Sequence, residues 1–482
     1  MRATPAASFD LIVIGAGAAG LAAARHAAQL GARTLLIDRA QAGGSCIHRG
    51  CVPKKLLGYG AAWSQTVARC LQAAAGHSRE AWQTAITRTR AEVARLHDAT
   101  RTHLAQAGVQ WLPGVASLRG RGAIRLATDE GKRTLRARQI VLATGAQPVP
   151  LSAPGAELAQ TSDDVFAWES LPASLVIVGG GVIAVELAST LARFGVRVTL
   201  LVREARLLPE FDTALSDAAA TSLAGHAVDV VLGAEVMRVE RDIVNSGVNG
   251  GVNGDGVAVY LNEPGRAVPR IVRAQRVVAA IGRAPATDGL GLDAAGITLD
   301  PHGHIVVDRH FRTRSRGVHA IGDVCGGPQL TPVASAQGRY VAERLFGKAV
   351  KLPDMAMVPT AVFCEPAIAA VGLTEAQARA RWPDRPERAE RDTRAAAAER
   401  IDVVEHRFVS LEQRFAGTAA PSMIKLVCNA RSGRVLGAHV VDNAAPEIVQ
   451  ALTVAVRMGV RLKHLRTTVG LHPTVAEELL AV

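Results

Sequence analysis

The chain has 482 residues, of which 49% are hydrophobic and 20% are charged. This length exceeds the roughly 250 to 300 residues at which a single hydrophobic core stops growing, so we expect several domains. The composition excludes a largely disordered chain, because enough apolar surface is present to build a packed interior.

The formal net charge is +12, from 55 basic and 43 acidic residues. Nucleic-acid sites usually combine clustered basic residues with aromatic side chains, whereas aromatics here make up 4% and the arginines are scattered among alanines. We therefore expect a solvated basic surface that attracts anionic small molecules, and no nucleic-acid partner.

The six cysteines are too sparse for a secreted scaffold held together by disulfides, and only Cys46 and Cys51 lie close in sequence. The apolar stretch near the N-terminus follows no basic cluster, and no window reaches the ~18 strongly apolar residues of a membrane span. These features predict a cytoplasmic protein that does not enter a membrane.

The first predicted element is an apolar strand over residues 10–14, which runs into GAGAAG and an alanine-rich helix. In such a dinucleotide fingerprint, Gly15 makes the turn, Gly17 admits a pyrophosphate, and Gly20 lets helix and strand pack. A second strand ends at Asp38, whose carboxylate can accept a hydrogen bond from a ribose hydroxyl. The first part of the chain is therefore predicted to bind a dinucleotide.

The same pattern returns in LVIVGGGVIAVELA, where Gly179, Gly181 and Ala184 occupy the three fingerprint positions. The strand that follows ends at Arg203 in place of an acid, and Arg206 lies three residues later. Since arginine suits a 2′-phosphate, we expect this second nucleotide to be NADP rather than NAD.

Between and after the fingerprints, residues 80–106 are predicted to form a helix, and ARQIVLATGAQP a strand with a turn at Gly145. Further apolar strands ending in glycine follow in VVAAIGRAP and GVHAIGDVCGG. The insertion SGVNGGVNGDG separates two strand-like stretches, which predicts a hairpin with a flexible tip.

The stretch GGSCIHRGCVPKK contains both close cysteines and raises three alternatives: a metal clip, a structural disulfide or a working redox pair. A zinc site needs about four ligands, and no second close pair supplies them, so we predict no metal. A static disulfide fits poorly with a reducing compartment, whereas a dithiol beside a two-electron carrier has clear chemistry. His48 and Arg49 would lower a thiol pKa if they pointed inward, but charged loop residues more often point to water.

Together these segments, with AIGD, LTPVASAQGR and HPTVAEEL, resemble the class I pyridine nucleotide-disulfide oxidoreductases over nearly the whole chain. Within that family, GCVPKK and HPTVAEEL are most similar to the glutathione reductases. The resemblance implies an α/β fold with two Rossmann-like dinucleotide-binding domains, one for FAD and one for NADPH, and an α+β C-terminal dimerisation domain.

The resemblance also implies a division of the chain into an FAD-binding domain over 1–150 that carries the cysteine pair, and an NADPH-binding domain over 151–284. A central segment over 285–354 would complete the FAD site, and 355–482 would form the interface domain. The family's C-terminal histidine serves the partner subunit, so a homodimer with a shared active site is expected.

By the same resemblance, Cys46 attacks a substrate disulfide, while Cys51 lies against the flavin and exchanges electrons with it. Lys54 stands at the family's position for a lysine near the flavin, where it pairs with a glutamate that corresponds to Glu186. A fixed cation there would stabilise negative charge on the reduced flavin.

His472 and Glu477, in the motif HPTVAE close to the C-terminus, match the family's acid-base pair. A departing thiolate must be protonated, and histidine is the side chain that donates and recovers a proton near neutral pH. The glutamate would hold the second ring nitrogen.

The resemblance assigns further residues to cofactor and substrate binding. Two arginines are expected to hold an anionic substrate: Arg25 and Arg339. Further cofactor contacts are expected from Gly44, Ser45, Thr144, Gly145, Asp323, Thr331, Gly282 and Arg283.

These implications predict an NADPH-dependent flavoprotein that reduces glutathione disulfide. Three positions depart from the family pattern, namely Thr100, Val182 and Pro209, where the family has two tyrosines and an arginine. Another low-molecular-weight disulfide is therefore the alternative substrate, and an NADPH-sensing flavoprotein without turnover is the non-enzymatic alternative. Dihydrolipoamide dehydrogenase is disfavoured by Arg203 and by the two lysines that follow GCVP.

Overall fold

The computed structural model describes residues 8–70, 78–120, 122–242, 256–265, 268–348, 350–352, 354–355, 357–383, 400–417 and 421–482. By compactness the chain divides into two units. The first unit consists of Met1–Leu56, Ile86–Val149 and Gly282–Pro353, and the second of Leu57–Ala85, Pro150–Ile281 and Asp354–Val482. The four-domain division expected from the sequence stays a prediction.

The first unit is built on a seven-stranded sheet in the order β3-β2-β1-β6-β5-β4, with β17 beside β6. Strand β1 pairs in parallel with both β2 and β6, and Ile14 lies opposite Ile37 on one side and Leu142 on the other. The carboxyl ends of three strands therefore meet at one edge, where ligands bind in such sheets. The strands are β1 (Ser8–Ile14), β2 (Thr34–Asp38), β3 (Gln110–Pro113), β4 (Val115–Leu118), β5 (Ala123–Thr128), β6 (Gly131–Leu142) and β17 (Val318–Ala320), with a separate pair β7 (Ala146–Pro148) and β16 (Arg283–Pro285).

Strand β1 is buried on both faces, as its continuous apolar run requires. Leu11 and Val13 pack with α1 and α7, whereas Ile12 and Ile14 join a cluster on the opposite face with strands β4 and β5. The helices that carry residues of this unit are α1 (Ala18–Gln29), α2 (Gly44–His48), α3 (Cys51–Cys70), α4 (Ser78–Gln106) and α7 (Thr331–Phe346), of which α3 and α4 continue into the second unit. The helix expected over residues 80–106 is confirmed.

The second unit contains a parallel sheet in the order β11-β10-β9-β15-β8, which repeats the strand–glycine–helix arrangement of the first. Strands β12 and β13 pair antiparallel with Asp242 opposite Gly256, so the predicted hairpin is confirmed for its strands, while residues 243–255 at its tip lie outside the described residues. The elements are β8 (Ala159–Thr161), β9 (Ser174–Val178), α5 (Val182–Arg193), β10 (Arg197–Val202), α6 (Thr213–Gly225), β11 (Asp229–Leu232), β12 (Glu235–Asp242), β13 (Gly256–Asn262), β14 (Arg270–Ala274) and β15 (Arg276–Ala279).

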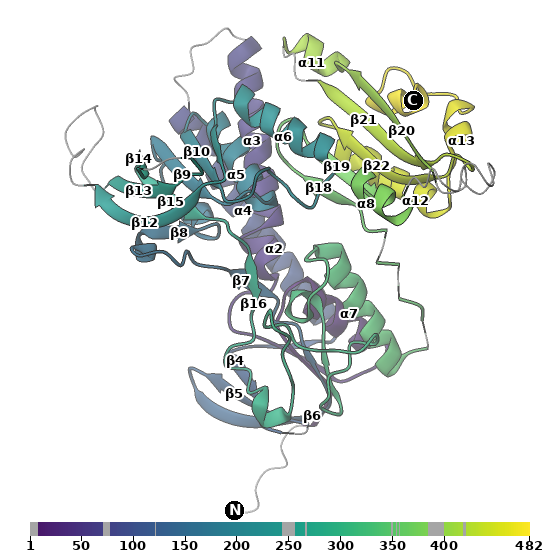
Figure 1. Cartoon of the computed structure of the whole chain (residues 1–482). Helices are drawn as coiled ribbons and strands as arrows, with labels where there is room; N and C mark the ends of the chain where they lie inside the picture. Colours follow the sequence, from purple (N-terminus) through teal and green to yellow (C-terminus); the bar gives the residue numbers. More distant parts are fainter. Residues whose placement is uncertain are drawn as a thin grey trace, which may run out of the picture. The chain divides into compact units, whose positions relative to one another are not determined.

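The C-terminal part of the second unit is an antiparallel sheet in the order β18-β19-β22-β21-β20, with α12 packed on it (Figure 1). Apolar residues three or four apart on α12 turn one face toward the sheet, and they include Ile448, Leu452 and Val456. The elements are β18 (Thr360–Val362), β19 (Ile368–Gly372), α8 (Glu375–Arg381), β20 (Ile401–Phe408), α11 (Leu411–Phe415), β21 (Ser422–Asn429), β22 (Val435–Val441), α12 (Ala445–Arg457), α13 (Leu462–Arg466) and the 3-10 helix η5 (Val475–Leu480).

The predicted fold class is confirmed: two Rossmann-like sheets built on parallel strands, the first with an antiparallel extension through β5 and β4, and an α+β C-terminal region occur in one chain. Across the parts of the chain that the structure describes, we find no helix both long and apolar enough to cross a membrane.

Candidate active site

The first glycine fingerprint has the geometry of a phosphate cradle. Gly15 has φ +109°, and a Cβ placed there would lie 2.2 Å from the carbonyl oxygen of Ala143, so only glycine fits the turn. Gly17 is the N-cap of α1 and offers no side-chain acceptor, which leaves the first N–H groups of the helix to a ligand. A Cβ on Gly20 would lie 1.8 Å from the oxygen of Gly15, so this glycine brings helix and turn together.

Asp38 lies at the same edge of the sheet. Its Oδ2 accepts the N–H of Ala16 at 2.6 Å and its Oδ1 accepts the N–H of Ala40 at 2.7 Å. Each carboxylate oxygen has a further lone pair, so the side chain is held beside the fingerprint and can still accept from a ribose hydroxyl. The cradle and this acid together fit FAD.

Other predicted cofactor residues gather in the first unit. Gly44 begins α2 against the fingerprint, since a Cβ there would lie 2.6 Å from the Cα of Gly17. Arg283 donates from Nη2 to the Oγ of Ser45 at 3.4 Å and to the carbonyl of Ala146 at 2.6 Å. The start of α2 is thus tied to the strand pair β7–β16.

The remaining predicted cofactor residues lie at ends of strands and helices. Thr144 follows β6 and donates to the carbonyl of Ala286 at 2.7 Å. Gly145 and Gly282 both have positive φ, at +70° and +130°. Burial raises the pKa of Asp323, although the positive charge of Arg283 opposes this shift.

The second fingerprint repeats the first. Gly179 has φ +133° and a Cβ there would lie 2.3 Å from the oxygen of Ala280, while Gly181 is the N-cap of α5. Ala184 is fully buried at the third position, and Val182, which replaces a family tyrosine, is the first residue of α5. This loop fits a second pyrophosphate.

Both arginines after β10 lie in the loop beside this fingerprint, where the N–H of Leu208 donates to the carbonyl of Gly180 at 2.8 Å. Arg203 is 81% exposed and pairs with Glu204 at 3.0 Å. Arg206 donates to the Oγ1 of Thr213 at 2.9 Å and to the carbonyl of Pro209 at 2.7 Å. A cationic, accessible loop of this kind fits a 2′-phosphate.

Cys46 lies on α2 and Cys51 begins α3, and both are present as thiols that share a hydrogen bond. That hydrogen bond and then burial raise the pKa of Cys46, while Thr331 and the charge of Lys54 lower it. The Sγ of Cys51 lies 3.7 Å from the Oγ1 of Thr331, the first residue of α7. Within the described residues, no group of three or more potential ligands could hold a metal ion.

The two basic residues between the cysteines differ in their surroundings. His48 Nε2 donates to the carbonyl of Ala42 at 3.0 Å, and burial lowers the pKa of His48. His97 of α4 donates to the same carbonyl from Nδ1 at 3.1 Å. His48 therefore braces the loop before the cysteine helix, while Arg49 is exposed.

Arg25, Arg339 and Cys46 line one pocket of about 360 Å³ in the first unit. The two arginines come from α1 and α7, which lie unusually close because a Cβ on Gly338 would lie 2.3 Å from the oxygen of Ala19. The other lining residues are Ala18, Leu21, Ala22, His26, Gln29, Gly43, Ile47, Thr331 and Ser335. The structure thus brings the two arginines predicted to bind substrate into one pocket with Cys46.

Sequence reasoning missed His26, whose Nε2 lies 2.5 Å from Glu343 Oε2 in the wall of this pocket. The available signal was its position directly after Arg25 on a helix that otherwise consists mainly of alanine. Thr100, which replaces a family tyrosine, donates within α4 to the carbonyl of Leu96 at 2.8 Å.

His472 and Glu477 meet in the second unit. The Nδ1 of His472 lies 3.0 Å from Oε1 and 3.1 Å from Oε2 of Glu477, and the His472 side chain is 82% exposed. Thr474 caps η5 by accepting the N–H of Glu477 at 3.3 Å, so the acid is fixed by the start of this short helix. The exposed imidazole is oriented by a carboxylate, as an acid-base group requires.

The predicted pair of Lys54 and Glu186 is divided between the two compact units, and their contact stays a prediction. Glu186 is 1% exposed on α5 and its Oε1 accepts the N–H of Phe363 at 2.8 Å. Lys54 lies in the first turn of α3 beside the cysteines.

The other cysteines differ in their surroundings. Cys364 and Cys428 are buried, as expected for small apolar side chains, and Cys325 is half-buried. The side chain of Cys70 lies outside the described residues.

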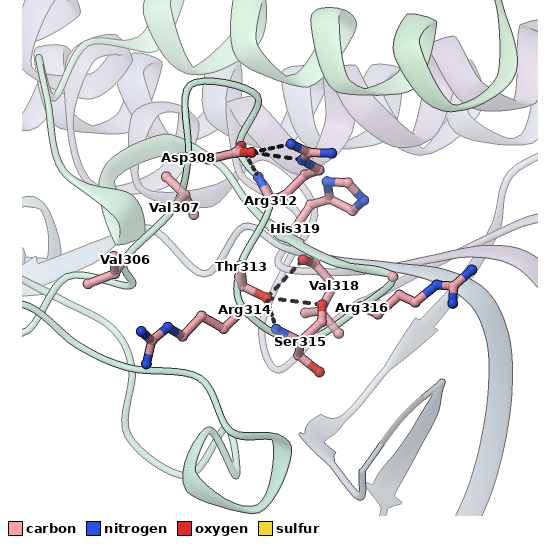
Figure 2. Close-up of a pocket in the computed structure, with 11 residues that line it drawn as sticks. Val306, Val307, Asp308, Arg312, Thr313, Arg314, Ser315, Arg316, Val318 and His319 are labelled. Carbon is pink, nitrogen blue, oxygen red and sulfur yellow. Dashed lines mark hydrogen bonds and ion pairs between the residues drawn. The ribbon is translucent and has the colours of Figure 1, made fainter.

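A second pocket, of about 520 Å³, is lined only by residues between 306 and 319 (Figure 2). Asp308 and Arg312 pair there at 2.7 Å, and Thr313 closes a turn by donating to the carbonyl of Val318 at 2.9 Å. This hollow contains no residue that the sequence assigned to the site.

Comparison with known proteins agrees with this geometry. Residues 9–338 match the model of the pyridine nucleotide-disulphide oxidoreductases, and residues 389–481 match that family's dimerisation domain. A glutathione reductase from Burkholderia cepacia is 36% identical over 479 residues, which cover 98% of each chain. A glutathione reductase from Nostoc is 32% identical over 490 residues, covering 98% of this chain and 99% of the relative.

A dihydrolipoyl dehydrogenase from Chlorobaculum parvum is 32% identical over 476 residues, covering 98% of this chain and 95% of the relative. The cofactors are FAD and NADPH, in agreement with the two glycine cradles and with the family match. The chain belongs to the pyridine nucleotide-disulphide oxidoreductase family.

Proposed function

We propose that this protein is an NADPH-dependent reductase of glutathione disulfide. The observation that carries the proposal is the pocket in which Cys46 lies with two exposed arginines, Arg25 and Arg339. Glutathione disulfide carries four carboxylates, and arginine binds carboxylates through paired, charge-assisted hydrogen bonds. The glutathione reductases among the relatives support this substrate class.

In the first half of the reaction, FAD supplies the chemistry that takes a hydride from NADPH and passes an electron pair to the Cys46–Cys51 disulfide. Arg203 and Arg206 hold the 2′-phosphate of the nucleotide, and the N-terminus of α5 receives its pyrophosphate. Lys54, in the first turn of α3, would stabilise the negative charge that a bound flavin gains on reduction.

In the second half, the thiolate of Cys46 attacks one sulfur of the substrate disulfide, forms a mixed disulfide and displaces the first thiolate. Because the hydrogen bond with Cys51 raises the pKa of Cys46, this cysteine needs a base to become a nucleophile. His472 of the partner subunit takes that proton and returns it to the leaving thiolate. Cys51 then attacks Cys46, releases the second thiolate and restores the disulfide.

This scheme requires a homodimer, and the match of residues 389–481 to a dimerisation domain supports one. We also propose a cytoplasmic location, where a small thiol pool is kept reduced. The sparse cysteines of the chain support that compartment.

Steady-state NADPH consumption with a panel of disulfides tests the proposal. The panel contains oxidised glutathione, its amide, cystine, trypanothione disulfide and lipoamide. We expect oxidised glutathione to have the highest kcat/KM and its amide to be at least about tenfold lower, because amidation removes the two glycine carboxylates and leaves only the two γ-glutamyl carboxylates for the arginines. A higher kcat/KM for any other disulfide would contradict the glutathione assignment, and no turnover with any of them would favour a sensor.

A further inference from the structure

A buried charge network joins two distant parts of the second unit. Lys425 on β21 is 5% exposed, and its Nζ lies 2.8 Å from Asp212 Oδ1 and 2.8 Å from Glu375 Oε2. Asp212 itself is 2% exposed. Removing one partner of such a buried pair leaves an uncompensated charge, so these contacts hold their segments tightly.

Asp212 is the centre of this network. Its Oδ1 also accepts the N–H of Ala214 at 3.1 Å as the N-cap of α6, and its Oδ2 accepts the N–H of Glu375 at 2.9 Å. Burial raises the pKa of Asp212, but the hydrogen bonds from Lys425 and the Glu375 N–H outweigh this effect and hold the pKa below its ordinary value. The N-terminus of α6 is thereby fixed by a permanent anion anchored in the C-terminal sheet.

The arginine loop ends at this anchored helix. Arg206 donates to the Oγ1 of Thr213, the first residue of α6, at 2.9 Å. Leu208, in the middle of the loop, has φ +49°, a conformation that a non-glycine residue keeps only when its surroundings impose it. Its N–H donates to Gly180, and its carbonyl accepts the Oγ of Ser216 at 3.3 Å, so the loop is fastened between the fingerprint and α6.

We propose that Lys425 is a positioning residue for NADPH, which acts through Asp212 to hold α6 and thereby Arg206 at the 2′-phosphate. This inference rests on the proposed function only in assigning Arg203 and Arg206 to that phosphate. A strand of the C-terminal region, besides its place in the dimerisation domain, then sets nucleotide selectivity.

Isothermal titration of the FAD-loaded full-length protein with 2′,5′-ADP and with 5′-AMP tests this inference without turnover or disulfide. In Lys425→Met we expect the affinity for 2′,5′-ADP to fall about tenfold, because the charged hydrogen bond from Arg206 to the 2′-phosphate is misplaced. The affinity for 5′-AMP, which has no 2′-phosphate, should change less than about twofold. Lys425→Arg restores most of the loss. Lys463→Met, the same change at an exposed position on α13, has no effect.

Two further variants keep the test decisive if Lys425→Met does not fold. Glu375→Gln removes one arm of the network and leaves the Lys425–Asp212 contact, and it lowers the 2′,5′-ADP affinity about threefold. In an Arg206→Ala background, the Glu375→Gln change costs less than about twofold more, because the residue through which it acts is already gone.

Unchanged 2′,5′-ADP affinity in Lys425→Met and in Glu375→Gln, or equal losses for both nucleotides, would overturn the inference. If the wild-type protein binds 2′,5′-ADP and 5′-AMP equally, the NADPH assignment itself is wrong and the inference falls with it. The choice of disulfide does not enter this experiment, so its outcome is independent of the glutathione assignment.

Discussion

The two nucleotide-binding regions have nearly the same backbone and different side chains. Gly15 and Gly179 both have positive φ. A Cβ placed on either would lie 2.2 or 2.3 Å, respectively, from a backbone carbonyl oxygen. The N-cap glycines of α1 and α5 have φ −77° and −85°, with ψ −174° and −175°. Geometry alone therefore gives each region the same phosphate cradle.

The difference lies at the end of the second strand of each region. Asp38 is held there by two backbone N–H groups, whereas Arg203 extends 81% exposed into solvent. The first region is also the one that continues into the cysteine helix α2. The glycine cradle therefore fits the pyrophosphate of either FAD or NADPH. A few residues outside the cradle determine which cofactor binds and what chemistry follows.

The largest effect is expected from the cysteine segment, which only the first region carries. Cys51→Ser should reduce disulfide turnover by at least about a thousandfold, because the resolving thiol is lost, while NADPH still bleaches the flavin. Anaerobic stopped-flow absorbance measures both effects, since a thiolate beside the flavin adds a long-wavelength band in the wild type but not in Cys51→Ser. Cys428→Ser, at a buried cysteine on β21, is the matched control and keeps the band.

If the wild-type protein gives only flavin bleaching, the redox role assigned to the cysteine segment of the first region is contradicted. The cysteine pair would then be inactive, and the sensor alternative would gain support.

The third fingerprint position gives the next effect. Gly20→Ala places a Cβ 1.8 Å from the oxygen of Gly15, so α1 has to move and FAD affinity should fall about a hundredfold or more. Ala184→Gly in the second region creates no such clash and costs about 1 kcal/mol of stability through helix propensity. Flavin absorbance per chain and thermal unfolding distinguish the two outcomes. Full flavin content in Gly20→Ala would contradict the packing argument.

A smaller effect is expected from the arginine loop. The double change Arg203→Ala and Arg206→Ala should lower the ratio of kcat/KM for NADPH over NADH about a hundredfold, since two charged contacts to the 2′-phosphate are lost. Flavin content should not change. Arg197→Ala, at the exposed start of β10, serves as the control. Equal wild-type rates with NADH and NADPH would refute this assignment.

The smallest effect concerns the response of the two compact units to acid. Burial lowers the pKa of His319 on β17 from 6.5 to about 4, so its neutral form stabilises the first unit fully above pH 6.5, and this contribution is lost as the pH falls toward 4. In the second unit the pKa values of Asp212 and Glu375 are lowered from 3.8 and 4.5, so their contribution is lost only at more acidic pH. Burial also lowers the pKa of His439, which lies 4.0 Å from Asp212, so this unit too loses some stability as the pH falls below 6.5.

At pH 5 the first unit should therefore have lost about 2 kcal/mol relative to pH 7 through His319, whereas the carboxylates of Asp212 and Glu375 should keep their charge. Hydrogen exchange of peptides from β6 and from β21, corrected for the intrinsic pH dependence, measures each unit separately. His319→Gln should remove the change in β6. Unchanged protection of β6 between pH 7 and 5, or a loss in β6 that persists in His319→Gln, would be inconsistent with the pKa shift of His319.

Much of this arrangement was predictable because its signals are local in sequence. A glycine that must adopt positive φ, an apolar strand before it and a charged residue after the next strand all lie within about 30 residues. The motif HPTVAE likewise contains both members of its pair, and the structure brings His472 and Glu477 to 3.0 Å.

Contacts between distant residues could not be predicted, because no local pattern encodes them. Lys425 meets Asp212 across 213 positions, and His97 reaches Ala42 across 55. The direction of the His48 side chain belongs to the same class of contact. The carbonyl of Ala42 accepts hydrogen bonds from the imidazoles of both His48 and His97. The sequence around His48 does not indicate that its imidazole binds the carbonyl of Ala42 together with His97.

The central claim is that an electron pair from NADPH arrives at the sulfurs of Cys46 and Cys51. Counting thiols in the air-oxidised FAD-loaded protein before and after one equivalent of NADPH, with alkylation and peptide mass mapping, tests it most directly. We expect two additional thiols per chain, at Cys46 and Cys51. An unchanged thiol count, or new thiols at other cysteines, would contradict it.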